Sequence, residues 1–158
     1  MVRVNPGACY TCDREAEFDR LPPREVIGYD DRWRVVHSTG SGLLGWLVLV
    51  PRRHVMELAE LTAEEAAGLG TWQVRLARAL AAELGTPKTY VAEFGEAPGF
   101  HLHFHVVPRP VDLDPDLCGP GVFGLLGRGE ADEVSTHERD ALARRLAARL
   151  RTPVDAEV

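Results

Sequence analysis

Three histidines, His101, His103 and His105, alternate with single apolar residues in the second half of the chain. In an extended strand, alternate side chains share one face at a spacing of about 7 Å, so the three imidazoles are expected to form a row. Such a row could bind a metal ion, or it could present a nucleophilic ring nitrogen to a phosphate beside neighbouring donors. The chain has only 6 histidines, so strict alternation of three of them favours function over a polar face with scattered histidines.

A second group with chemical potential is the C-x-x-C pair Cys9 and Cys12. Such a pair could be redox-active, form half of a zinc site, or be coincidental. A redox pair of the thioredoxin type follows a strand and opens a helix, whereas this pair lies just behind Pro6 and Gly7 near the N-terminus. Two cysteines supply half of a tetrahedral zinc site, which needs two further ligands. Cys118 has no candidate partner in the sequence and is expected to be an unreactive thiol.

The segment His-Leu-His-Phe-His-Val-Val at residues 101–107 resembles the signature of the histidine-triad family, in which three histidines alternate with apolar residues. Residues 45–54, Gly-Trp-Leu-Val-Leu-Val-Pro-Arg-Arg-His, are similar to the family's strand that ends in Ile-Pro-Lys-x-His. The pair at residues 9–12 is similar to the C-x-x-C of the zinc-bearing members. The resemblance extends over residues from about 9 to 110.

The resemblance implies a nucleotide hydrolase or nucleotidyltransferase that acts at the α-phosphorus of a small nucleotide, of the phosphoramidate or dinucleoside polyphosphate type. The middle histidine of the family attacks the phosphorus and forms a nucleotidyl-histidine intermediate, which makes His103 the expected nucleophile. The third histidine contacts the phosphate, and this role falls on His105. Imidazole is a good nucleophile near neutral pH, and division of one displacement into two steps lowers each barrier.

Four further residues are candidates for substrate binding. Glycine lets the backbone approach a phosphate closely, arginine could attract it, and many family members bind the ribose with an Asp where this chain has His37 and Ser38. The candidates are His101, Gly99, Ser38 and Arg109. Trp46 stands where many members carry a histidine that orders the triad, so this helper is expected to be missing. The loop of residues 95–100 also lacks the serine that helps to protonate the leaving group.

The resemblance also implies a structural zinc ion, because zinc-bearing members complete the C-x-x-C site with two histidines. Here these positions are His54 and His101, together with Cys9 and Cys12. Such a closed site would hold the N-terminal arm against the sheet. It would leave only His103 and His105 to act on the phosphate. No organic cofactor is implied.

Two alternatives differ in class from this hypothesis. One is a metalloenzyme that uses all three triad histidines as ligands and keeps a fourth position open. The other is a non-catalytic member that binds nucleotides or proteins, which the missing helper histidine and ribose-binding Asp favour.

The elements that must position these residues are five strands and two helices. Alternating or continuous apolar runs between turn residues predict strands at residues 25–29, 33–37, 45–50, 88–94 and 100–107. A capping box at Thr62 and Glu65, leucines at helical spacing and a terminal Gly85 predict a long helix at 62–84. A second capping box predicts a helix at 136–151, while residues 1–24 form an arm that bears the zinc knuckle and residues 111–134 an irregular surface segment. We predict an α+β domain over residues 1–158 with an antiparallel five-stranded sheet.

The bulk properties limit the partners of this domain. The 158 residues suit one domain, and the net charge of −6 argues against a broad nucleic-acid surface. The longest apolar run, residues 42–50, is too short to span a membrane, and a cytoplasmic location is expected. Family members of this type form homodimers through the long helix and the strand at 88–94, so Trp72 and Tyr90 are interface candidates.

Overall fold

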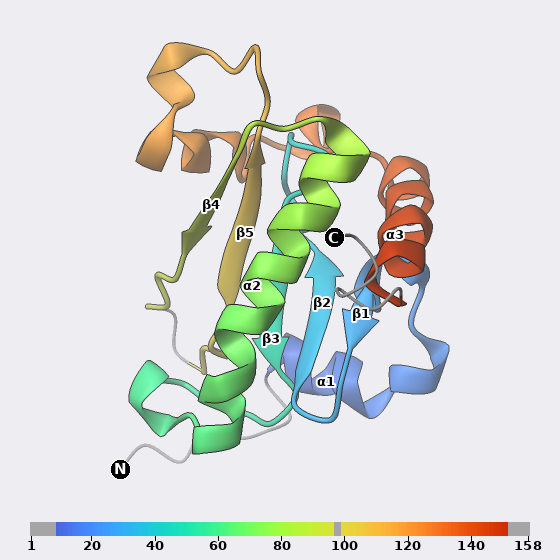
Figure 1. Ribbon diagram of the computed structural model, residues 1–158, viewed down its shortest axis with the longest axis vertical. Helices are drawn as coiled ribbons and strands as arrows, with labels where there is room; N and C mark the ends of the chain where they lie inside the picture. The colour runs from blue at the N-terminus through green and yellow to red at the C-terminus, as the bar shows by residue number, and fades with distance from the viewer. Residues whose placement is uncertain (1–8, 97–98, 152–158) are drawn as a thin grey trace, which may run out of the picture.

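The computed structural model describes residues 9–96 and 99–151 and contains a five-stranded antiparallel sheet in the order β1-β2-β3-β5-β4 (Figure 1). The predicted α+β class and the number of strands are confirmed. The strands are β1 (Gly28–Tyr29), β2 (Trp33–His37), β3 (Leu47–Pro51), β4 (Lys88–Ala92) and β5 (Phe104–Arg109). The helices are α1 (Tyr10–Ala16), α2 (Ala63–Leu84) and α3 (Thr136–Arg151).

Strand β5 begins three residues after His101, later than the sequence predicts. Its ladder with β3 runs from Leu49 opposite Phe104 to Leu47 opposite Val106. Before Phe104 the main-chain bonds change partner, because the Leu102 N–H donates to the Val55 carbonyl at 2.7 Å. The chain bearing His101 and His103 therefore leads into β5 without being part of its regular ladder.

One face of the sheet packs against α2 and α3, with α2 crossing in front of the strands in Figure 1. Side chains from β2, β3, β5 and both helices form the main core, including Trp33, Leu49, Leu76, Phe104 and Leu142. Both predicted capping boxes are present: one joins Thr62 and Glu65 at α2, the other Ser135 and Glu138 at α3. They satisfy helix N–H groups that the first turn leaves free. Gly85 ends α2 in the left-handed conformation at φ 64°.

The opposite face carries a second, smaller apolar cluster. Trp46 and Val107 point away from the main core and pack with Val122, and all three are fully buried. Val122 belongs to the segment 111–134, which the sequence analysis describes as irregular surface. In the structure this segment forms short 3₁₀ helices at Pro115–Leu117, Gly119–Leu125 and Glu130–Asp132, and the second of these covers part of the sheet. The prediction of a surface segment is wrong for residues 122–126, because their apolar side chains pack on the second face of the sheet.

The N-terminal arm is held on the sheet by a buried ion pair. Arg34 of β2 is 1% exposed, and it donates through Nε to Glu15 of α1 at 2.9 Å. Arg52 also donates to Glu15, and its guanidinium lies 4.5 Å from the Phe18 ring centroid. Of the predicted arm at 1–24, residues 1–8 lie outside the described part. Among the described residues, no helix is long and apolar enough to cross a membrane.

Candidate functional site

The histidine row lies on the sheet face opposite α2. Leu102 and Phe104, which separate the histidines, belong to the main core under the helices. Alternation then turns the histidine side chains to the other face, as the sequence predicts. His101 is buried at 5% exposure, whereas His103 and His105 are half-buried.

At one end of the row, His101 meets the two cysteines of the arm. Its Nδ1 lies 3.5 Å from the Cys9 sulfur and 3.6 Å from the Cys12 sulfur, and His54 Nδ1 lies 3.2 Å from the Cys12 sulfur. A tetrahedral zinc, with Zn–S of about 2.3 Å and Zn–N of about 2.0–2.1 Å, separates its sulfur and nitrogen ligands by about 3.6 Å. The ligand atoms of all four residues lie within 4.8 Å of one another. The four predicted zinc ligands thus come together at separations that fit one metal ion.

The hydrogen bonding of His101 suits the same role. Its Nε2 lies 2.7 Å from the Pro51 carbonyl, which can only accept, so Nε2 carries the proton and the Nδ1 lone pair faces the sulfurs. Burial, with Cys9 alongside, raises the pKa of the Cys12 thiol, and a bound cation would stabilise its thiolate form. Both ring nitrogens of His101 are therefore engaged, and this predicted substrate-binding residue belongs to the cysteine cluster.

Among residues 9–96 and 99–151, only one ring nitrogen of the middle histidine has a hydrogen-bond partner. His103 Nδ1 lies 2.9 Å from the main-chain carbonyl of His101, so it donates its proton there and Nε2 keeps its lone pair. The Phe100 ring packs against His103 with centroids 4.9 Å apart. Gly95 lies directly against Phe100, since a Cβ there would meet its ring at 1.8 Å. From the sequence, a main-chain carbonyl on an adjacent strand is the expected acceptor; this is wrong about the strand, because the carbonyl comes from two residues earlier in the same segment.

The third histidine is oriented by Trp46. The indole Nε1–H of Trp46 donates to His105 Nδ1 at 3.0 Å. The rings of His103 and His105 meet edge to face with centroids 4.8 Å apart, and Phe123 lies 5.1 Å from His105 on another side. Burial lowers the pKa of His105 to about 4, with His103 adding to the shift, so the ring is neutral at neutral pH.

The three imidazoles do not converge on one point. His101 turns Nδ1 to the cysteines, while the Nδ1 atoms of His103 and His105 bond to a carbonyl and an indole. Among the described residues, Nε2 of His103 and Nε2 of His105 have no hydrogen-bond partner, and the centroids of the two rings lie 4.8 Å apart. This arrangement suits a nucleophile with an adjacent donor better than a metal site of three histidines.

The other predicted substrate-binding residues are placed differently from one another. Gly99 adopts φ 73° just before Phe100, a left-handed conformation that glycine adopts without strain. Ser38 follows β2 and pairs through its N–H with the Trp46 carbonyl at 2.8 Å. Arg109 is six residues beyond His103 on extended chain, at about 20 Å, opposite Lys88 of β4. The structure does not bring Arg109 together with the histidine pair.

His37, which the sequence analysis considers beside Ser38, is a structural residue. Its Nδ1 donates to the Ser38 carbonyl at 2.9 Å, and its Nε2 accepts from the Gly45 N–H at 2.9 Å. Burial lowers the pKa of His37 to about 4. With both nitrogens bound to the main chain, the ring braces the loop that leads into Trp46.

Two contributors to this site were not predicted from the sequence. Trp46 supplies the hydrogen bond that was expected to be lost with the helper histidine; its place before the strand at 47–51 was the available signal. Phe123 comes from a segment with no periodicity, so no local signal indicated it. The α1 helix, which Cys9 opens as its N-cap, was also not predicted.

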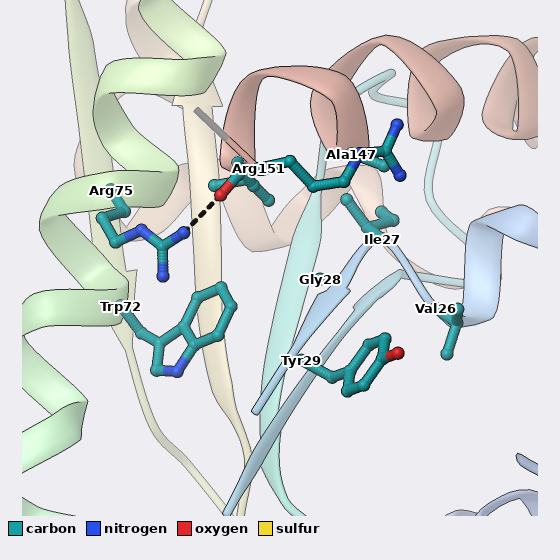
Figure 2. A pocket seen from close by; sticks show the side chains of 9 residues that line it. Val26, Ile27, Gly28, Tyr29, Trp72, Arg75, Ala147 and Arg151 are labelled. Carbon is teal, nitrogen blue, oxygen red and sulfur yellow. Dashed lines mark hydrogen bonds between the residues drawn. The ribbon is translucent and has the colours of Figure 1, made fainter. Parts of the chain in front are cut away.

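A cavity of about 440 Å³ lies elsewhere, at the β1 edge of the sheet. Tyr29, Trp72 and Arg75 line it together with the end of α3, and Arg75 donates to the Leu150 carbonyl (Figure 2). None of the predicted site residues lines this cavity.

Comparisons with known proteins agree with this geometry. The family described as the HIT domain matches residues 20–111. A search of curated proteins gives no significant match. Among solved structures, a histidine triad protein from Sinorhizobium meliloti 1021 is 28% identical, with a TM-score of 0.64 over 87% of this chain and 94% of that one. A Zn-bound histidine triad family protein from Mycobacterium smegmatis is 23% identical, with a TM-score of 0.67 over 92% and 95%. A third, from Bradyrhizobium japonicum, is 24% identical, with a TM-score of 0.65 over 85% and 93%.

Proposed function

Because the chain belongs to the HIT domain family, we propose that it is a nucleotide hydrolase or nucleotidyltransferase that forms a covalent intermediate on His103. The observation that carries the proposal is the bond from His103 Nδ1 to the His101 carbonyl. It fixes the neutral tautomer in which Nε2 is unprotonated and nucleophilic. The half-buried His105 beside it offers a second ring nitrogen to the same phosphate.

The reaction is a double displacement at the α-phosphorus. The Nε2 lone pair of His103 attacks phosphorus, and the bond to the leaving group breaks with its electron pair moving to that group. Water or another acceptor then attacks the phosphorus, the P–N electrons return to Nε2, and the proton of the acceptor is released to solvent. While the nucleotide is attached, the Nδ1–H bond to the His101 carbonyl stabilises the charged ring. Gly99, two residues before His101, and Ser38, which follows β2, are the proposed contacts for phosphate and ribose.

A structural zinc ion is the second part of the proposal. Cys9, Cys12, His54 and His101 would hold it, supported by the sulfur–nitrogen separations of 3.2–3.6 Å and by the zinc in the Mycobacterium smegmatis protein. A closed site of this kind supplies folding energy and no open position for substrate. The Pro51 carbonyl orients His101 as metal-bound histidines require. No organic cofactor takes part.

The proposed assembly is a homodimer through β4, which is an edge strand of the sheet. Val91 and Phe94 are exposed at 45% and 67%, and Val74 of α2 at 49%, so this side offers apolar area. Tyr90 remains an interface candidate, but Trp72 does not. Trp72 is 3% exposed in the core of its own chain, where its indole donates to Asp30 at 2.7 Å. Three cysteines without a disulfide suit the cytoplasm, the location we propose.

The experiment that tests the nucleophile is rapid quenching with a nucleotide substrate that donates AMP, followed by peptide mass analysis. One adenylate should appear on the peptide that holds His103 in the wild type, and none in the His103→Ala variant. His137→Ala is the matched control, because His137 is exposed on α3. A label on any other residue, or unchanged turnover in His103→Ala, would overturn the mechanism.

A further inference from the structure

Trp46 and His105 are joined by a hydrogen bond whose direction is fixed by chemistry. The indole nitrogen of tryptophan can only donate, so His105 Nδ1, at 3.0 Å, must accept. A neutral imidazole has one N–H, and with Nδ1 accepting it lies on Nε2. His105 is therefore held as the Nε2–H tautomer, in a ring whose centroid lies 4.8 Å from that of His103.

The indole is itself held in place from several sides. Trp46 is fully buried, packs with Val107 and Val122, and meets the Phe123 ring at a centroid distance of 5.2 Å. The residue before it, Gly45, adopts φ 89°, and a Cβ there would lie 2.5 Å from the end of Leu84. The N–H of Gly45 is bound by His37. The packing around Gly45 and Trp46 thus holds the backbone of both residues and the indole ring in place.

This contact changes what His105 can do. To act as an acid it would have to carry protons on both nitrogens, which would set its Nδ1–H against the indole N–H. Burial opposes the same charged form and keeps the pKa of His105 at about 4. The neutral ring can donate a hydrogen bond from Nε2 but has no acidic proton to give away. A histidine in place of Trp46 would differ, since imidazole can accept as well as donate.

We propose that Trp46 is a positioning residue that restricts His105 to hydrogen-bond donation, and that the protein therefore prefers nucleotide substrates whose leaving group departs as an anion. This inference rests on the function proposed above. When the bond from Pα to a bridging oxygen breaks, the electron pair stays on the departing phosphate or polyphosphate, which is stable without a proton. When a P–N bond breaks, the departing amine needs a proton that His105 does not supply. The substrate class is thus a nucleoside polyphosphate or dinucleoside polyphosphate in preference to a phosphoramidate.

The tautomer can be tested without any turnover. In ¹⁵N-labelled wild-type protein at neutral pH, NMR should find His105 protonated at Nε2 and unprotonated at Nδ1. In Trp46→Phe, which removes the donor, the two tautomers should mix. Trp33→Phe is the matched control, because Trp33 is also fully buried and donates at 3.0 Å, to the Glu65 carbonyl. A wild-type His105 protonated at Nδ1 would overturn the proposal.

The leaving-group preference is tested by the ratio of kcat/KM for diadenosine tetraphosphate to that for adenosine 5′-phosphoramidate. The ratio should exceed tenfold in the wild type, fall several-fold in Trp46→His, and stay at the wild-type value in Trp33→Phe. A wild-type preference for the phosphoramidate, or a ratio unchanged in Trp46→His, would overturn the inference while the nucleophile mechanism stood. Absence of turnover with both substrates would instead overturn the proposed function, and the leaving-group preference with it.

Discussion

The histidines at the two ends of the row, His101 and His105, have different chemistry because their ring nitrogens have different partners. At one end the Nδ1 lone pair of His101 faces two sulfurs, because a carbonyl takes the proton of its Nε2. At the other end the Nδ1 lone pair of His105 accepts a hydrogen bond from the indole N–H of Trp46. Between them the His103 ring gives its Nδ1–H to a carbonyl and keeps a free Nε2. The partner of one ring nitrogen decides what the other nitrogen can do.

The two ends are also held by separate parts of the chain. The cysteine end depends on α1, which Arg34 and Arg52 fix through Glu15. The other end depends on Trp46 and on the segment around Phe123. A substitution at one end should therefore change stability or turnover with little effect at the other.

The largest effect is expected for His103→Ala. Loss of a covalent nucleophile should lower kcat by about 10⁴-fold or more, while the unfolding transition stays close to that of the wild type because His103 is half-buried. Steady-state kinetics and chemical denaturation measure the two quantities. A smaller loss in His105→Ala is expected, since His105 binds and does not attack. Equal losses of stability and turnover in His103→Ala would contradict the division between the two ends.

Cys9→Ser should have the opposite effect, a large loss of stability with little change in kcat. Removal of one metal ligand should lower the free energy of unfolding by about 3 kcal/mol or more, because metal binding contributes to folding, and should change kcat less than threefold. Denaturation and metal analysis of protein purified without chelator provide the measurement. Cys118→Ser is the matched control, since this partly buried thiol lies outside the cluster. Equal metal content in both variants would refute the proposed zinc site.

His37 is a reference histidine outside the row, since main-chain groups bind both its nitrogens. Its pKa of about 4 in the folded state lies below the value of about 6.5 expected after unfolding, so the unfolded chain binds the proton first as pH falls. The neutral His37 ring contributes fully to the free energy of unfolding above about pH 6.5. This contribution decreases as the pH falls towards 4, by about 3 kcal/mol in total. The free energy of unfolding should therefore depend less on pH in His37→Gln than in the wild type. Parallel pH curves for the two proteins would contradict this assignment.

The smallest effect is expected for Gly95→Ala, which acts on His103 through Phe100. A Cβ at position 95 would meet the Phe100 ring at 1.8 Å, and this ring lies 4.9 Å from that of His103. Displacement of the nucleophile should lower kcat by about tenfold. Gly70→Ala is the control: it has open space inside α2 and should raise stability by about 1 kcal/mol. Unchanged kcat in Gly95→Ala would show that Phe100 does not position His103.

The sequence by itself determined the local elements. The bounds of β2 and α3 agree with the prediction, and both capping boxes form, because these features depend on residues three or four positions apart. The single face of the histidine row follows from strand alternation. The zinc ligands came from resemblance, since Cys9 and His101 are 92 positions apart and no periodicity connects them.

Only the tertiary structure decided the roles of the three rings. Trp46 and His105 are 59 positions apart, and their contact depends on the register of β3 against β5. The contact of Phe123 with His105 depends on how the segment 111–134 packs on the second face of the sheet. The burial of Trp72 likewise follows from the packing of α2 in the core. A hydrogen bond of about 3 Å requires two backbones to be placed within a fraction of an ångström, and only the folded chain provides that placement.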